Sequence, residues 1–194
     1  MDKVLVVLAA ILLAVMGRRN HAGLKALQGW GYAHRGLHGN GVPENSMQAF
    51  RLAVENGYGA ELDVHLLADG NLAVIHDSKL MRTTGMEGRV EDLTADQLKD
   101  YRLEGTEETI PTFREVLEAF VGTDLVLVCH IDVYSDALMQ QFGALIEEFG
   151  CQDQIIAFLE FGRDKTYNYR NCPAGIGFAA GNCAGRKVDD SATA

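Results

Sequence analysis

The chain has 194 residues, of which 47% are hydrophobic and 23% charged, and this is enough for one globular domain with a sizeable core. Its formal net charge of −10 argues against nucleic acid as a partner, because phosphate binding needs a basic surface, and it disfavours nonspecific docking on anionic lipid. No two of the four cysteines form a CxxC pair, which argues against a zinc ribbon or a thioredoxin-like motif. We expect buried free thiols, or disulfides if the domain lies outside the cytoplasm.

An uncharged hydrophobic run, VLVVLAAILLAVM, occupies residues 4–16. It lacks the polar face of a soluble core helix and is shorter than the roughly 20 residues of a full membrane span. Its length fits the apolar region of a signal peptide, but no small-x-small cleavage site follows it. We therefore expect residues 1–28 to be an uncleaved membrane anchor and connector. This pattern does not determine on which side of the membrane the main domain lies, and cleavage would instead give a secreted protein.

Strand and helix patterns alternate along residues 29–184, which we expect to form the main domain before a polar tail at 185–194. Strands are expected at 29–33, 58–66, 72–75, 125–133, 155–158 and 175–180, and helices at 46–56, 112–121, 135–149 and 163–171. This alternation predicts a parallel α/β sheet with right-handed crossovers. A TIM-type (β/α)8 barrel has eight strands and about 250 residues, whereas we count six predicted strands. We therefore expect a TIM-type barrel that is incomplete at its C-terminus.

Residues 78–111 do not fit this regular pattern. They are polar and irregular, and we expect an insertion with one helix beginning at Thr94, where Gln97 completes the spacing of a capping box.

Two acidic side chains, Glu61 and Asp63, lie two residues apart on the predicted strand 58–66 and so point to the same face. Paired carboxylates repel unless a cation lies between them, and Mg²⁺ and Ca²⁺ prefer oxygen ligands. The alternative is a solvent-exposed acidic strand face. The metal site is favoured, because the other face of the strand is apolar and both neighbouring strands end in histidine.

Histidine is the side chain best suited to proton transfer near neutral pH, and His34 and His76 each follow a predicted strand. We therefore expect them to act as a general acid and base, in either order. Arg35 offers a fork that matches phosphate geometry; its alternative role is a salt bridge with Glu44 or Asp77. Asp77 would orient a histidine or bind a loop amide.

A set of motifs in fixed order resembles the signature of the glycerophosphodiester phosphodiesterase family. The set comprises His34-Arg35-Gly36, Pro43-Glu44-Asn45-Ser46, Glu61-x-Asp63-Val64, Asp69-Gly70 and His76-Asp77, with Ile110-Pro111-Thr112 ahead of a later helix. The resemblance covers about residues 30–180 and weakens after residue 122. It implies a TIM barrel related to the phosphatidylinositol-specific phospholipases C, and metal-dependent cleavage of a glycerophosphodiester to an alcohol and sn-glycerol 3-phosphate.

The resemblance also implies roles for single residues. Glu61 and Asp63 match metal ligands, and Glu44 matches an acid near that metal, which makes it a third candidate ligand. Arg35 matches a phosphate-binding residue, while His34 and His76 match the acid–base pair. The cofactor implied is a divalent metal ion, Mg²⁺ or Ca²⁺.

The sequence departs from the family at the fourth predicted strand, where Glu-Ile-Lys is usual and His130-Ile131-Asp132 stands instead. His130 becomes the fourth candidate metal ligand, and an imidazole shifts metal preference toward transition metals. Asp132 puts negative charge where phosphate should bind, unless it serves as a further metal ligand. Two alternatives to the phosphodiesterase follow: a catalytically impaired relative that acts as a binding domain, and a lysophospholipase D-like enzyme acting on lysophospholipids, which an N-terminal anchor would suit.

Overall fold

The computed structural model of the chain describes residues 31–131, 133, 135–160 and 177–181. The predicted anchor and connector (1–28), the predicted helix at 163–171 and the polar tail (185–194) lie outside these residues. Within the described part of the chain, no helix has both the length and the hydrophobicity that a membrane crossing requires.

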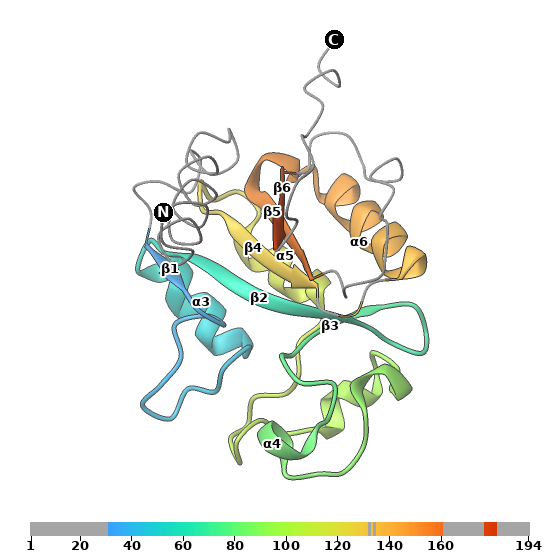
Figure 1. Cartoon of the computed structure of the whole chain (residues 1–194). Coiled ribbons are helices and arrows are strands. Elements are labelled where there is room, and N and C mark those ends of the chain that lie inside the picture. The colour runs from blue at the N-terminus through green and yellow to red at the C-terminus, as the bar shows by residue number, and fades with distance from the viewer. Residues whose placement is uncertain (1–30, 132, 134, 161–176, 182–194) are drawn as a thin grey trace, which may run out of the picture.

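Five of the described strands are parallel and form one sheet, as predicted for an α/β barrel. They are β1 (Tyr32–Ala33), β2 (Gly59–Leu66), β4 (Leu127–Ile131), β5 (Ile155–Glu160) and β6 (Gly177–Gly181), in that spatial order. Figure 1 shows the sheet fanning from β1 to β6 without closing on itself. The described strands are therefore an open part of a barrel.

The third strand, β3 (Leu72–Val74), corrects the prediction of six parallel strands, because it pairs antiparallel with β2. Only residues 67–71 separate the two strands, and the Leu67 amide donates to the Asn71 carbonyl at 2.9 Å to close the turn. A parallel return needs a crossover of a dozen or more residues, so a link this short makes a hairpin.

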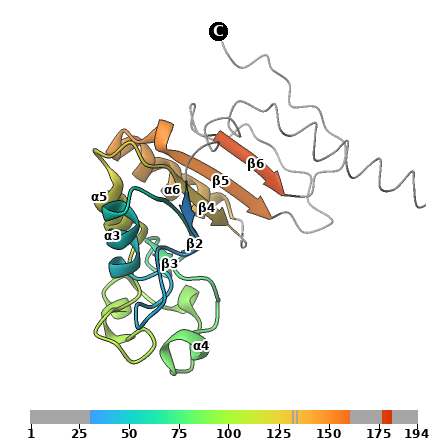
Figure 2. The ribbon, with the colours of Figure 1, turned by 90° about the vertical axis from the view of Figure 1, so that its left-hand side faces the viewer.

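Three helices cover one face of the sheet: α3 (Met47–Glu55), α5 (Phe113–Phe120) and α6 (Asp136–Phe149) (Figure 2). Each begins one residue after its predicted start, and the residue at the predicted start is the N-cap. Ser46 caps α3, Thr112 and Glu115 form a complete capping box on α5, and Ser135 caps α6, which ends at left-handed Gly150. The main core lies between helices and sheet and includes Phe50, Leu62, Val64, Phe113, Phe120, Leu127, Cys129, Ile131 and Phe142.

The stretch after β2, residues 67–111, has a hydrophobic core of its own, and the part of it around α4 forms the lower part of Figure 1. It contains α4 (Met81–Thr84), η1 (Val90–Asp92) and η2 (Gln97–Asp100), and its core gathers Leu67, Ala73, Ile75, Leu80, Val90, Leu93, Leu98, Leu103 and Ile110. The predicted helix at Thr94 is wrong in extent: Thr94 donates to Gln97 Oε1 at 2.8 Å, but only the short 3₁₀ helix η2 follows. We call residues 67–111 the satellite.

Strand β3 joins the two cores, because its side chains alternate between them. Leu72 and Val74 belong to the main core, whereas Ala73 and Ile75 belong to the core of the satellite. The residue that follows this strand pattern, His76, therefore lies at the junction between the sheet and the satellite.

Candidate active site

The predicted site residues meet at one end of the sheet because of strand direction and register. His34 and Arg35 follow β1, and in the parallel pair β2–β4 Asp63 lies opposite His130. Strand β3 brings His76 to the same place for a different reason. It runs antiparallel to β2, so its end returns past Asp63, whose carbonyl accepts from the Ile75 amide at 3.1 Å.

Glu61, Asp63 and His130 form a compact group of candidate metal ligands. One ligand atom from each lies within 4.8 Å of the others, and His130 Nδ1 is 3.6 Å from Asp63 Oδ1. Asp63 is only 3% exposed, which excludes the alternative of a solvent-exposed acidic strand face. Atoms at this spacing fit around a divalent cation, whose bonds to oxygen or nitrogen measure about 2.0–2.6 Å.

The two carboxylates differ in electrostatic environment. Burial raises the pKa of Glu61, and the neighbouring Asp63 charge raises it further. Burial alone would also raise the pKa of Asp63, but hydrogen bonds with His130 and Asn45 offset it and lower the pKa. Asp63 is thus more readily ionised than Glu61. A cation placed between the two carboxylates would offset the repulsion that Asp63 exerts on Glu61.

Arg35 contacts three acids from a strained backbone position. Its φ is 53°, in the left-handed region that a non-glycine residue rarely adopts. Its amide donates to Glu61 Oε2 at 3.1 Å, its Nη1 donates to Glu44 Oε1 at 3.1 Å, and its Nε lies 3.5 Å from Asp63 Oδ2. The alternative salt bridge with Glu44 is therefore present, and it holds the guanidinium beside the three-residue group.

Glu44, a predicted metal ligand, lies outside the three-residue group and is bound by arginines. Its Oε1 accepts from Arg35 and also from Arg82 Nη2 at 2.6 Å. Burial would raise the pKa of Glu44, but the two guanidinium groups offset this and lower it. Its role toward a metal stays a prediction.

The two predicted acid–base histidines have unequal surroundings. The His34 side chain is 67% exposed, and its Nε2 lies 3.9 Å from Glu61 Oε2. His76 is held by its neighbour, because His76 Nδ1 lies 2.9 Å from Asp77 Oδ1. The expectation that Asp77 orients a histidine is confirmed. Since the carboxylate accepts, Nδ1 carries the proton and Nε2 is left as the exchanging nitrogen.

Sequence reasoning missed three contributors. Asn45 is buried with φ 52°, and its Nδ2 donates to Asp63 Oδ2 at 3.1 Å. His65 is 3% exposed and binds the His76 carbonyl through Nε2 at 3.1 Å. Its alternation with Glu61 and Asp63 along β2 was a usable signal. Arg82 in α4 carried no such signal.

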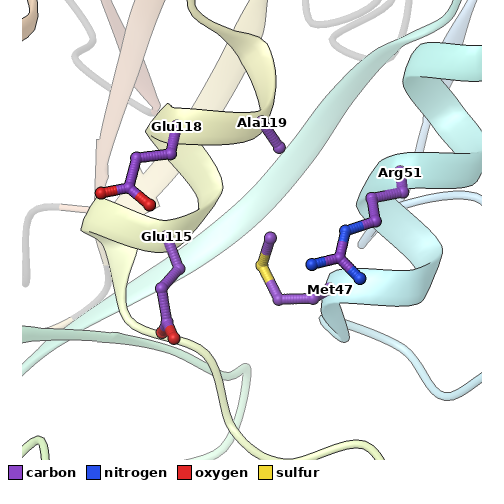
Figure 3. A pocket seen from close by; sticks show the side chains of 5 residues that line it. All are labelled: Met47, Arg51, Glu115, Glu118 and Ala119. Atoms are coloured by element: carbon purple, nitrogen blue, oxygen red, sulfur yellow. The ribbon is translucent and has the colours of Figure 1, made fainter.

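Two further expectations concern the cysteines and Asp132. Cys129 and Cys151 are buried free thiols, as expected, and Cys172 and Cys183 lie outside the described residues. Asp132, which we expected to place negative charge where phosphate binds, lies outside the described residues. A hollow of about 380 Å³ between α3 and α5 contains none of the predicted site residues (Figure 3); it is lined by Met47, Arg51, Glu115, Glu118 and Ala119.

Comparison with known proteins agrees with this geometry. A model of the glycerophosphoryl diester phosphodiesterase family matches residues 34–163. A glycerophosphodiester phosphodiesterase of Bacillus altitudinis is 51% identical over 94 residues, covering 45% of this chain and 38% of the relative. One from Caldanaerobacter subterraneus subsp. tengcongensis is 38% identical over 134 residues, covering 64% and 55%. A lysophospholipase D of Rattus norvegicus is 35% identical over 130 residues, covering 60% and 40%.

Among solved structures, a phosphodiesterase of Oleispira antarctica in complex with the product sn-glycerol-3-phosphate is similar. It has a TM-score of 0.61 and 25% identity, and the match covers 70% of this chain and 59% of that one. The chain spans about half the length of the curated relatives that it matches, or less.

Proposed function

Because the chain belongs to the glycerophosphoryl diester phosphodiesterase family, we propose that its site hydrolyses a glycerophosphodiester to an alcohol and sn-glycerol 3-phosphate with a divalent cation bound. The observation that carries this proposal is the convergence of Glu61, Asp63 and His130 within 4.8 Å, directly beside Arg35. A phosphodiester needs positive charge around its oxygens, which Arg35 and a bound cation would supply. It also needs a proton donor at its leaving group, which His34 or His76 would supply.

Glu61, Asp63 and His130 would hold the cation, which when bound supplies positive charge next to the phosphoryl oxygens. Two carboxylates support Mg²⁺ or Ca²⁺, whereas the imidazole of His130 favours transition metals. The donor set therefore makes Mn²⁺ a competitor to be tested beside the two hard cations.

Side chains of the protein bind the phosphate and transfer the protons. Arg35 binds the phosphoryl oxygens, held in place by Glu44 and by its own amide on Glu61. One histidine takes the proton from the attacking water or glycerol hydroxyl, which forms the new phosphorus–oxygen bond. The other donates a proton to the alcohol oxygen as the old bond breaks. If the glycerol hydroxyl is the attacker, this step gives a cyclic phosphodiester, and water must then open the ring to give sn-glycerol 3-phosphate. His76, fixed by Asp77, and the exposed His34 can exchange these roles.

The test measures glycerol 3-phosphate released from glycerophosphocholine with Mg²⁺, Ca²⁺, Mn²⁺ or EDTA. We expect release that depends on the metal and that falls by about 10²–10⁴ in His76→Ala, because a general acid or base is lost. Thermal melting with each cation gives an independent reading of metal binding. His130→Glu, which restores an all-carboxylate set, should shift preference from Mn²⁺ toward Mg²⁺ and Ca²⁺ in both assays.

Folded protein that binds metal but releases no product would refute hydrolysis and favour a catalytically impaired binding domain. The imidazole of His130 among the metal ligands is the observation that favours this alternative. A second alternative is lysophospholipid hydrolysis, supported by the similarity to a lysophospholipase D. Choline release from lysophosphatidylcholine that exceeds release from glycerophosphocholine would select it.

We also infer that the hydrophobic run at residues 4–16 anchors the chain to a membrane, on the strength of its composition. Fractionation of cells expressing the chain with and without residues 1–28 tests this. Equal amounts of both forms in the soluble fraction would contradict the anchor.

A further inference from the structure

Arg82 lies between two carboxylates that come from different parts of the chain. Its Nη2 donates to Glu44 Oε1 at 2.6 Å, and its Nε donates to Asp77 Oδ2. Its neighbours in sequence anchor it, since Leu80 is fully buried in the satellite core and Thr83 is also buried. The guanidinium is thus presented to the site from a fixed element.

Arg82 and His76 hold opposite oxygens of the same carboxylate. Asp77 Oδ2 accepts from Arg82, while Asp77 Oδ1 lies 2.9 Å from His76 Nδ1. A carboxylate bound at one oxygen can rotate, whereas one bound at both has a fixed plane. The orientation of the His76 ring therefore depends on Arg82 through Asp77.

The second contact of Arg82 extends the network to the phosphate-binding side of the site. Glu44 Oε1 accepts from both Arg82 and Arg35, so the five side chains form one continuous series: Arg35, Glu44, Arg82, Asp77 and His76. Arginine suits the central place because its planar fork donates in two directions at once. A lysine, with a single flexible ammonium group, cannot hold both carboxylates in one geometry.

We propose that Arg82 is a positioning residue that fixes the tautomer and orientation of His76 through Asp77 and couples them to Arg35 through Glu44. This inference rests on the proposed hydrolysis for its kinetic consequence, but its structural consequence is independent of activity. Loss of Arg82 should impair proton transfer more than substrate binding, because Arg82 contacts the carboxylates of Asp77 and Glu44, and Asp77 in turn holds the histidine.

The kinetic test compares wild type, Arg82→Met and Arg82→Lys on glycerophosphocholine with metal present. We expect kcat to fall about tenfold to a hundredfold in Arg82→Met, with KM changed less than about threefold, and a smaller loss in Arg82→Lys. Arg102→Met is the matched control. Arg102 is also in the satellite, is similarly exposed (52% against 47%) and pairs with Glu107, so its loss should leave both constants unchanged.

The second test reads the His76 ring directly by long-range ¹H–¹⁵N spectra of metal-free, histidine-labelled protein at about pH 8.5, where imidazole in general is neutral. His76→Ala assigns the signals. Wild type should show the Nδ1–H tautomer, and Arg82→Met a mixture of tautomers, while Arg102→Met should match wild type. If Arg82→Met proves unfolded by thermal melting, Arg82→Lys gives the same comparison.

An unchanged His76 tautomer in a folded Arg82 variant would overturn the proposal, and so would a rise in KM with kcat intact. The two proposals can fail separately. If the wild type is inactive but Arg82→Met still changes the His76 tautomer, the proposed hydrolysis is refuted and the positioning role of Arg82 is supported.

Discussion

Replacing Gly36 with alanine tests how the loop after β1 is held against α3. Gly36 has a φ of +78°, and a Cβ at this position would lie 2.7 Å from Ala49 Cβ and 2.9 Å from the Ala49 carbonyl carbon. Because Ala49 is fully buried in α3, the helix has little room to yield. The loop must move instead, and Arg35 moves with it.

Gly57→Ala is the matched control, since Gly57 has a similar φ of +71° but a Cβ there would have nothing within 4 Å. Both variants incur about 1–2 kcal/mol for a left-handed alanine. The entropy change of the unfolded chain is the same in both and cancels in the comparison. Only Gly36→Ala also overlaps packed atoms, which costs about 1–3 kcal/mol. We expect unfolding free energies lower by about 2–5 kcal/mol for Gly36→Ala and about 1–2 kcal/mol for Gly57→Ala.

Urea unfolding followed by circular dichroism measures both losses, with equal m-values as the check that the unfolded states are comparable. Turnover of glycerophosphocholine should also fall in Gly36→Ala and stay unchanged in Gly57→Ala, because only the first variant displaces Arg35. Equal losses of stability in the two variants would refute the close contact between the loop and α3.

Two further predictions concern acid stability and thiol reactivity. Burial would raise the pKa of Asp69, but hydrogen bonds from the amides of Ala95 and Asn71 lower it below the ordinary aspartate value. Ionised Asp69 therefore stabilises the fold at pH values above the ordinary aspartate pKa. In urea titrations, the difference in unfolding free energy between wild type and Asp69→Asn should vanish as pH falls from about 5 to 2. A difference that does not change with pH would contradict this. Burial raises the pKa of Cys129, so iodoacetamide should label it in urea but not in the native protein, as peptide mass spectrometry would show; equal labelling rates would count against a buried thiol.

Local sequence signals determined the helices and the position of the site along the chain. The capping residues Ser46, Thr112 and Ser135 mark the true helix starts, because a cap is an interaction within four residues. The alternation of Glu61 and Asp63 with apolar neighbours on β2 likewise needs only the two-residue period of a strand. The resemblance of the ordered motifs to one family was confirmed by the match to residues 34–163.

The direction of β3 was also within reach of the sequence, since residues 67–71 are too few for a crossover. The expectation of a regular strand–helix repeat hid this. The core of the satellite was missed for a similar reason. Its apolar residues, among them Leu80, Leu98 and Ile110, lie far apart in a mostly polar stretch without a helical or strand period.

Only the tertiary structure decided which side chains touch. Asp63 meets His130 because of the register of β2 against β4, and Arg82 reaches Glu44 across 38 residues because β3 returns antiparallel and α4 packs on the satellite core. Such contacts depend on how separately folded segments are placed by their buried faces. No periodicity or cap within a single segment encodes that placement, so the sequence identified the acids and histidines of the site but not the arginine that joins them.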